Sequence, residues 1–186
     1  METAHTHGHE RRYGSGPERL RAPGRIALLE IPRVVSLCRE GIEAARVLDV
    51  GTGTGLFAEA FAKDGCEVAG VDPNADLLAI ARQHAAGVFL VGTAERLPFE
   101  SGSFDLVMMG HVLHETDNRA AALREARRVA RHRVAVLEWP YSDEEQGPPL
   151  SHRLQESEIR SLAREAGFTA IDMTVLARTH LYRLTP

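Results

Sequence analysis

The chain has 186 residues, of which 44% are hydrophobic, a size and composition that suit one domain with one sizeable core. Its formal net charge is −4, and no run of basic residues indicates binding to nucleic acid. The two cysteines lack the spacing of metal ligands, and no segment has the pattern of a signal peptide or a membrane span. Composition therefore predicts a reduced, cytoplasmic protein whose partner is neither nucleic acid nor a membrane.

Residues 1–24 are predicted to form a flexible N-terminal arm, because charged and Gly/Pro-rich sequence there shows no period. Three histidines, His5, His7 and His9, occupy alternate positions, a pattern that can bind a metal but is more often a solvated tail, so no metal site is predicted. Residues 25–186 are predicted to form a single domain. It begins with one kinked or two short helices, since the helical period between residues 25 and 42 is interrupted by Pro32.

The sequence RVLDVGTGTG at residues 46–55 is the most informative stretch of the chain. Its first half is a short apolar run of the kind that forms a buried parallel strand. Three glycines then alternate at Gly51, Gly53 and Gly55, and a helical pattern follows from Leu56 until Gly65 ends it. Glycines at such a turn allow a ligand to approach the backbone closely, while the free N–H groups of the helix face the ligand. The stretch therefore predicts a ligand-binding loop.

The spacing of the glycines and one acidic residue indicate the kind of ligand. A dinucleotide site has the pattern G-x-G-x-x-G, whereas Gly55 follows Gly53 by only two residues. Asp49 stands two residues before Gly51, where its charge would repel a pyrophosphate and suit a cation such as an α-amino group. The pattern resembles the first motif of the class I S-adenosylmethionine (SAM)-dependent methyltransferases. That resemblance implies that the loop passes the amino-acid part of SAM and that the acid helps to hold its ammonium group, directly or through water.

The second predicted strand, residues 67–72, ends at Asp72, which lies 21 residues after Gly51. An acid in this position can accept hydrogen bonds from both hydroxyls of a ribose. Sites for NAD and for SAM share this feature, so it supports an adenosyl ligand without choosing between the two. The alternative is that Asp72 only caps the helix that follows it.

After a third strand at residues 87–92, the chain has the sequence G-T-A-E-R-L-P-F from Gly92 to Phe99. This segment resembles the G-D-A-E-x-L-P-F of methyltransferases of the ubiquinone/menaquinone-biosynthesis type. The resemblance implies that the backbone at Ala94 meets the adenine ring and that the preceding side chain meets its exocyclic amine. Thr93 stands where those enzymes usually have Asp, and a hydroxyl accepts that hydrogen bond more weakly than a carboxylate.

The fourth strand begins at Phe104, and the loop at its carboxyl end faces the same crevice as Gly51. By the resemblance, Met109 and Gly110 line the methionine part of the cofactor. The polar groups nearest the methyl are His111, His114 and Glu115, and these are the predicted catalytic residues. The similar enzymes often have L-H-H where this chain has Leu113-His114-Glu115. The alternative is that His114 and Glu115 orient the loop and cap the next helix.

The rest of the chain predicts a helix at residues 118–130, a strand at 133–139, a helix at 156–167 and a closing hairpin of strands at 169–176 and 180–184. Ser157 is the expected cap of the last helix, and Glu138, Trp139 and Tyr141 are expected over the substrate. The predicted fold is an α/β, Rossmann-like, doubly wound, seven-stranded sheet with an antiparallel last strand and helices on both faces. The antiparallel strand matches the methyltransferase sheet, whereas a dinucleotide fold would continue in parallel.

The sequence thus predicts a SAM-dependent methyltransferase that moves a methyl group by in-line displacement to a small-molecule substrate. The alternatives are a SAM-binding protein without catalysis and a nucleotide-binding oxidoreductase. S-adenosyl-L-methionine is the predicted cofactor, and no metal is predicted. The predicted cofactor-binding residues are Asp49, Gly51, Thr52, Gly53, Gly55, Asp72, Pro73, Thr93, Ala94, Glu95, Met109 and Gly110.

Overall fold

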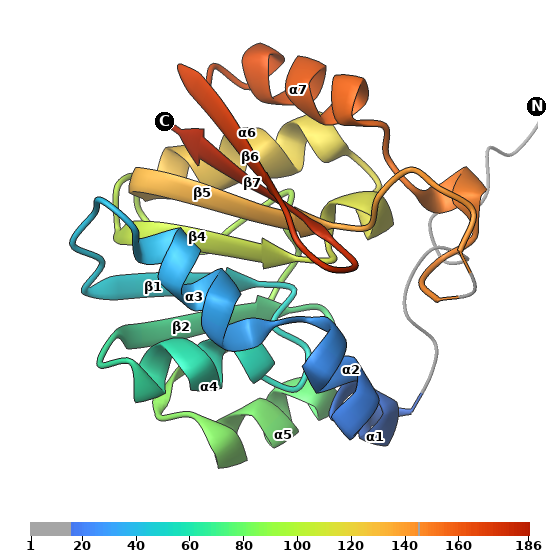
Figure 1. Cartoon of the computed structure of the whole chain (residues 1–186). Helices are drawn as coiled ribbons and strands as arrows, with labels where there is room; N and C mark the ends of the chain where they lie inside the picture. Colours follow the sequence, from blue (N-terminus) through green and yellow to red (C-terminus); the bar gives the residue numbers. More distant parts are fainter. Residues whose placement is uncertain (1–15, 145) are drawn as a thin grey trace, which may run out of the picture.

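The computed structural model describes residues 16–144 and 146–186, which form a seven-stranded sheet flanked by helices (Figure 1). From edge to edge, the strands are β3 (Gly87–Val91), β2 (Glu67–Asp72), β1 (Arg46–Val50), β4 (Phe104–Gly110), β5 (Ala130–Glu138), β7 (His180–Thr185) and β6 (Ala170–Val175). The first five strands run parallel, and β7 is antiparallel to both of its neighbours. The predicted doubly wound sheet with an antiparallel last strand is confirmed.

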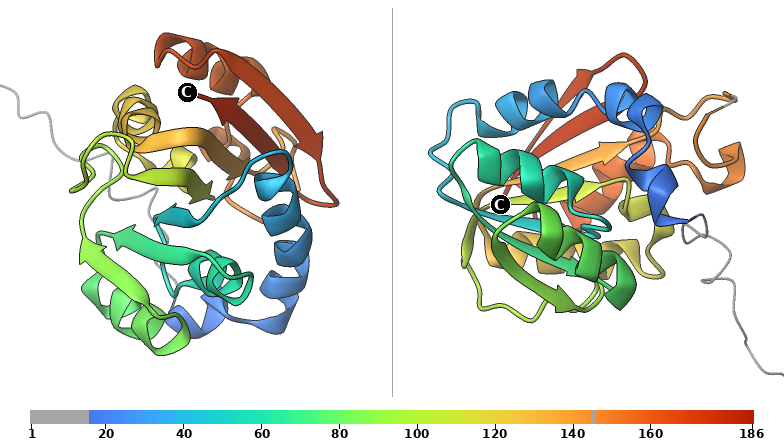
Figure 2. Two further views of the ribbon diagram at one scale, coloured as in Figure 1. Left: turned by 90° about the vertical axis from the view of Figure 1, so that its left-hand side faces the viewer. Right: turned by 90° about the horizontal axis from the view of Figure 1, so that it is seen from below.

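Helices cover both faces of the sheet, and each layer of helices buries its own core (Figure 2). One layer contains α3 (Ile31–Arg39), α4 (Leu56–Lys63) and α5 (Ala75–His84). The other contains α6 (Arg119–Val129) and α7 (Glu156–Glu165). Side chains of β1 alternate between the two cores, since Leu48 packs with the α6 layer and Val47 with the α4 layer. This alternation decides which side chains near the site can face a ligand.

Two short helices, α1 (Pro17–Leu20) and α2 (Pro23–Leu28), precede α3, and each begins with a proline. Arg21 between them fixes this region, because its guanidinium donates to the Thr54 carbonyl at 2.7 Å and pairs with Glu59 on α4. The predicted end of the arm at residue 24 falls inside α2 and is wrong, since helices of this length are too short to show a period. Residues 1–15, including the three alternate histidines, lie outside the described residues.

Two details near the carboxyl end complete the fold. The α7 helix begins after Gln155, so Ser157 lies in its first turn and the predicted cap at Ser157 is wrong. Gly167 follows the helix with a φ of +92°, as expected for a helix stop. In the part of the chain that the structure describes, no helix is both long and apolar enough to cross a membrane.

Candidate functional site

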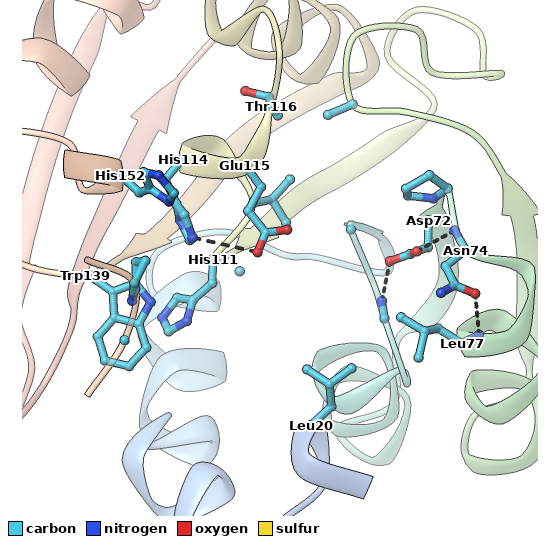
Figure 3. Close-up of a pocket in the computed structure, with 18 of the residues that line it drawn as sticks. Leu20, Asp72, Asn74, Leu77, His111, His114, Glu115, Thr116, Trp139 and His152 are labelled. Carbon is cyan, nitrogen blue, oxygen red and sulfur yellow. Dashed lines mark hydrogen bonds and ion pairs between the residues drawn. The ribbon is translucent and has the colours of Figure 1, made fainter. Parts of the chain in front are cut away.

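A cavity of about 1,300 Å³ opens at the carboxyl ends of the parallel strands (Figure 3). The loop after β1 contributes Gly51 and Gly53, β2 contributes Asp72, β4 contributes Gly110, and Trp139 follows β5. This edge is where open α/β sheets bind their ligands. The structure thus brings residues from four strands to one cavity, as the sequence predicts.

Gly51 and Gly55 have positive φ angles of +64° and +80°, which glycine adopts without strain. A Cβ atom at Gly51 would also clash with the Val112 side chain, so the backbone approaches that residue too closely for any other amino acid. Gly55 does not line the cavity; a Cβ atom there would lie 2.9 Å from the Cβ atom of Ala81 on α5. The prediction that Gly55 contacts the cofactor is therefore wrong, and the residue instead allows α4 and α5 to pack closely.

Asp49 is buried behind the glycine loop and does not line the cavity. Its Oδ2 accepts hydrogen bonds from the Thr52 hydroxyl at 2.7 Å and from the Ala58 backbone N–H at 3.1 Å. Burial raises the pKa of Asp49 to about 7, although these two hydrogen bonds lower it and the charge of Asp72 adds a smaller rise. Neither Asp49 nor Thr52 reaches the cavity, because position 49 faces the α4 layer and its carboxylate joins the loop to that helix, so of the two predicted ways for Asp49 to hold an ammonium group only the one through water fits the structure.

Asp72 lines the cavity, and its carboxylate accepts hydrogen bonds from two neighbouring turns. Its Oδ2 accepts from the Gly53 N–H at 2.8 Å, and its Oδ1 accepts from the Asn74 N–H at 2.8 Å. Burial raises the pKa of Asp72, and the two N–H groups oppose that rise. The residue that caps α5 is Asn74, whose side chain accepts from two N–H groups in the first turn. The alternative interpretation of Asp72 as the helix cap is therefore wrong, and its carboxylate remains at the cavity wall beside Pro73.

The turn after β3 forms the neighbouring wall, where Thr93, Ala94 and Glu95 line the cavity. Glu95 also accepts hydrogen bonds from the Asp117 and Asn118 N–H groups, at 3.0 and 3.4 Å. It thereby ties this turn to the start of α6. Because β3 pairs with β2 and the Gly92 N–H donates to the Asp72 carbonyl at 3.2 Å, this turn lies next to Asp72.

At the end of β4, Gly110 lines the cavity but Met109 does not. Met109 is fully buried in the core beneath α6. The prediction that it contacts the cofactor is wrong, because successive side chains of a strand point to opposite faces and this one points into the core. The run from Leu106 to Met109 is apolar without alternation, so it gives no sequence signal for which of its residues end at the ligand.

His111 directly follows β4 and has a φ of +60°, which is uncommon for a residue other than glycine. Its N–H donates to the Leu137 carbonyl at 2.8 Å, and its ring packs against Trp139 with the ring centroids 4.6 Å apart. Both ring nitrogens are buried, and none of the described residues is their hydrogen-bond partner. Burial, with smaller contributions from Arg25 and His114, holds the pKa of His111 well below its usual value. The site therefore presents an uncharged imidazole.

His114 lies in the short 3₁₀ helix η2 (Leu113–Glu115) and also lines the cavity. Its Nδ1 is 2.7 Å from Oε2 of Glu138, and its backbone N–H donates to Oε1 of the same residue at 3.1 Å. Its Nε2 is 3.8 Å from Oε1 of Glu115, too far for a hydrogen bond. Burial lowers the pKa of His114, but the Glu138 carboxylate and, to a smaller extent, Glu115 raise it above its usual value.

Glu138 is therefore the functional residue whose role the sequence analysis missed. It was expected over the substrate, yet it is buried beneath His114 and does not line the cavity. The prediction for Tyr141 is also wrong, since its side chain is 48% exposed and lies outside the cavity, whereas Trp139 lines it as expected. The position of Glu138 at the end of the strand beside β4 was the available signal for its partnership with His114.

The mouth of the cavity contains segments that the sequence did not assign to the site. Helices α1 and α2 contribute Arg19, Leu20 and Arg25, and residues 146–149 form another wall with His152. Arg153 holds that wall by donating to the carbonyls of Pro140, Gln146 and Pro148 at 3.2, 2.6 and 2.9 Å. Figure 3 shows Leu20 at the bottom of the view, with His114 and His152 on one side and Asp72 on the other.

Residues 48–137 match the family model described as "Methyltransferase domain". The Aquifex aeolicus SAM-dependent methyltransferase superposes with a TM-score of 0.75 at 21% identity, covering 92% of this chain and all of that one. Residues 48–137 of this chain thus resemble a methyltransferase domain, and the sheet shares the fold of a SAM-dependent methyltransferase. The methyltransferase domain accounts for the strand order, and S-adenosyl-L-methionine is the cofactor that it implies.

Curated relatives of the methyltransferase domain act in quinone biosynthesis according to their names. A demethylmenaquinone methyltransferase of Roseiflexus castenholzii is 46% identical over 103 residues, which are 50% of this chain and 42% of the relative. One from Chlorobaculum tepidum is 39% identical over 92 residues, 48% and 38% of the two chains. A ubiquinone biosynthesis O-methyltransferase of Sodalis glossinidius is 34% identical over 97 residues, 49% and 39%. The matched part thus spans less than half of each relative.

Proposed function

We propose that this protein is an enzyme that transfers the methyl group of SAM to a small-molecule acceptor. The observation that supports this function best is the composition of the cavity, which has Asp72 and the glycine loop on one side and His111 and His114 on the other. A site for the cofactor and a group able to take a proton would thus share one cavity. Demethylmenaquinone is the first acceptor to test, because it appears in the names of two relatives.

The residues of the cavity fit the proposed cofactor. The Asp72 carboxylate would hold the ribose hydroxyls, and Thr93, Ala94 and Glu95 would border the adenine. Gly53 leaves room for the methionine part, since a Cβ atom there would meet only the Leu20 side chain, at 3.7 Å, whereas the space beside Gly51 and Gly110 is filled by Val112 and Phe57. SAM supplies an electrophilic methyl group on a sulfonium, so the protein needs only to align the acceptor and to remove its proton where it carries one.

His114 is our proposed general base, and Glu115 and His111 complete the polar side of the cavity. Nε2 of His114 would take the proton of the acceptor X–H, and the freed X would accept the methyl group that SAM would supply. The distance of 3.8 Å between Nε2 and Oε1 of Glu115 supports this assignment, since Nε2 does not donate a hydrogen bond to that carboxylate. His111, uncharged and without a partner among the described residues, would instead hydrogen-bond to a bound molecule.

We also propose that the enzyme is cytoplasmic and does not bind nucleic acid. The formal net charge of −4 supports the second point, because phosphate backbones attract basic surfaces. The two buried, unpaired cysteines are compatible with a reducing compartment.

Calorimetric titration tests the cofactor. We expect SAM and its demethylated product to bind in the micromolar range and NAD not to bind. Tighter binding of NAD than of the SAM product would end the proposal. Transfer of a radiolabelled methyl group to demethylmenaquinone and to a panel of small nucleophiles then tests catalysis, and binding of SAM without any transfer would favour a non-catalytic SAM-binding protein.

A further inference from the structure

Glu138 uses both of its carboxylate oxygens on one residue. Oε1 accepts from the backbone N–H of His114 at 3.1 Å, and Oε2 lies 2.7 Å from Nδ1 of the same residue. Two contacts on one residue fix the position of its main chain and the orientation of its ring together. The carboxylate is 2% exposed and the imidazole 4% exposed, so water does not screen the pair.

We propose that Glu138 is a positioning residue that keeps a proton on Nδ1 of His114 and directs the free electron pair of Nε2 into the cavity. The proposal rests on the proposed function, in which Nε2 receives the proton of the acceptor. An ionised carboxylate can only accept hydrogen bonds, so at 2.7 Å the shared proton must come from the ring. A neutral His114 then has its lone pair on Nε2.

The burial of Glu138 supports a role beyond packing. A buried carboxylate without a partner is strongly disfavoured, and removing one partner of such a pair leaves an uncompensated charge. Among the described residues, His114 is the only ion-pair partner that Glu138 has, and Glu138 does not reach the cavity itself. Its charge can therefore act on the reaction only through His114, by stabilising the imidazolium that forms when Nε2 takes a proton.

Other charged groups around His114 are less well placed. Glu115 is on the same 3₁₀ helix, but its side chain is 28% exposed and its Oε1 is 3.8 Å from Nε2 (Figure 3). Arg119 on α6 opposes the charged form of the ring, and His111 after β4 is held neutral. Of the two carboxylates near His114, only Glu138 is buried and within hydrogen-bond distance of the ring.

The test compares Glu138→Gln with Glu115→Gln in the full chain, by NMR of ¹⁵N-labelled histidine rings across pH 5 to 9. In the unaltered protein we expect the Nδ1–H tautomer of neutral His114 and a pKa above about 6.5. Glu138→Gln should lower that pKa by about one unit or more and mix the tautomers, because a neutral amide does not stabilise the imidazolium. Glu115→Gln should lower the pKa less and leave the tautomer unchanged.

Turnover supplies a second readout once an acceptor is known. Glu138→Gln should lower kcat about 10- to 100-fold and shift the pH profile, with the dissociation constant of SAM nearly unchanged. Glu138→Asp keeps the carboxylate and should recover part of both the tautomer and the rate. If Glu138→Gln fails to fold, Glu138→Met, which is uncharged and of similar size, takes its place in the same NMR comparison. An unchanged pKa and tautomer in folded Glu138→Gln would overturn the proposal, even if the protein binds SAM, whereas failure of SAM to bind would overturn only the proposed function.

Discussion

Asp72 joins the ends of two neighbouring strands, because its carboxylate accepts a hydrogen bond of 2.8 Å from the backbone N–H of Gly53. One residue from β2 thus shapes the loop after β1 and also lines the cavity beside it. Its second oxygen accepts from Asn74 at 2.8 Å. Cofactor binding and the stability of the loop should therefore depend on the same side chain.

Asp72→Ala should weaken the binding of the demethylated SAM product by about 30- to 1,000-fold, or about 2 to 4 kcal/mol, since two charged hydrogen bonds to a ribose are lost. It should also lower the free energy of unfolding by about 1 to 3 kcal/mol, because two backbone N–H groups lose their acceptor. Calorimetry gives the affinity, and urea denaturation gives the stability.

Asp105 provides a matched control near the amino end of the central strand β4, away from the cavity. It accepts from the Ala45 and Arg46 N–H groups at 3.1 and 2.9 Å but does not line the cavity. Asp105→Ala should lose comparable stability and keep its affinity for the SAM product. If the two folded variants bound the SAM product with equal affinity, Asp72 would not be part of the cofactor site.

A second prediction concerns the glycine loop. Gly51→Ala adds a Cβ atom that clashes with Val112 at a φ of +64°, whereas Gly41→Ala adds one into open space at a φ of +73°. The Gly41 variant should lose only about 1 kcal/mol of stability from backbone strain. The Gly51 variant should lose more than this and bind SAM at least ten-fold more weakly, because the loop must move. Similar losses in both variants would show that the close approach to Val112 is unimportant.

The sequence predicted the strands along the chain and the antiparallel last strand because the apolar segments, the glycine turns and the closing hairpin are all local signals. It did not predict that Met109 points into the core, because every residue from Phe104 to Met109 is buried and periodicity cannot then choose a face. It placed Glu115, the immediate neighbour of His114, among the catalytic residues and did not identify the partner of the imidazole. The true partner, Glu138, is 24 positions away and meets His114 only through the pairing of β4 with β5.

The walls near the mouth of the cavity could not be predicted for a different reason. Helices α1 and α2 have four and six residues, too few to show a hydrophobic period. Residues 146–149 have no regular structure, and they are held by hydrogen bonds from Arg153 to main-chain carbonyls. Carbonyls are present at every position, so such contacts leave no pattern of residue types in a sequence.

A third prediction concerns His111. The pKa of His111 in the folded protein is well below 6.5. As the pH falls below 6.5, the unfolded chain therefore takes up a proton at this residue that the folded chain does not. His111 should therefore lower stability progressively under acidic conditions. His111→Phe, which keeps a ring against Trp139, should lose less stability than the unaltered protein between pH 7 and pH 5 in urea denaturation. If stability changed equally with pH in the two proteins, the His111 ring would be protonated in the folded state as it is in the unfolded state.

The last prediction uses Asp49, which has the opposite dependence on pH. Its pKa is about 7 in the folded protein, against a usual value of 3.8, so between these values the folded chain binds a proton that the unfolded chain releases. Stability should therefore fall as the pH rises through this window, and the penalty should be complete above pH 7. Asp49→Asn cannot ionise, and its side-chain oxygen can still accept from Thr52 or Ala58. Its stability relative to the unaltered protein should rise by about 1 to 4 kcal/mol from pH 4 to pH 8.

Asp105→Asn is the control for this measurement. Burial raises the pKa of Asp105, but the Arg46 and Ala45 N–H groups and Arg131 lower it further, so its net shift is downward. A carboxyl with a lowered pKa stabilises the fold above its usual pKa and loses that contribution only under more acidic conditions. The difference between Asp105→Asn and the unaltered protein should consequently stay constant from pH 5 to pH 8. If the stability difference between Asp49→Asn and the unaltered protein stayed constant over the same range, Asp49 would be ionised in the folded protein. Its expected role would then be a water-mediated ion pair with the ammonium group of SAM.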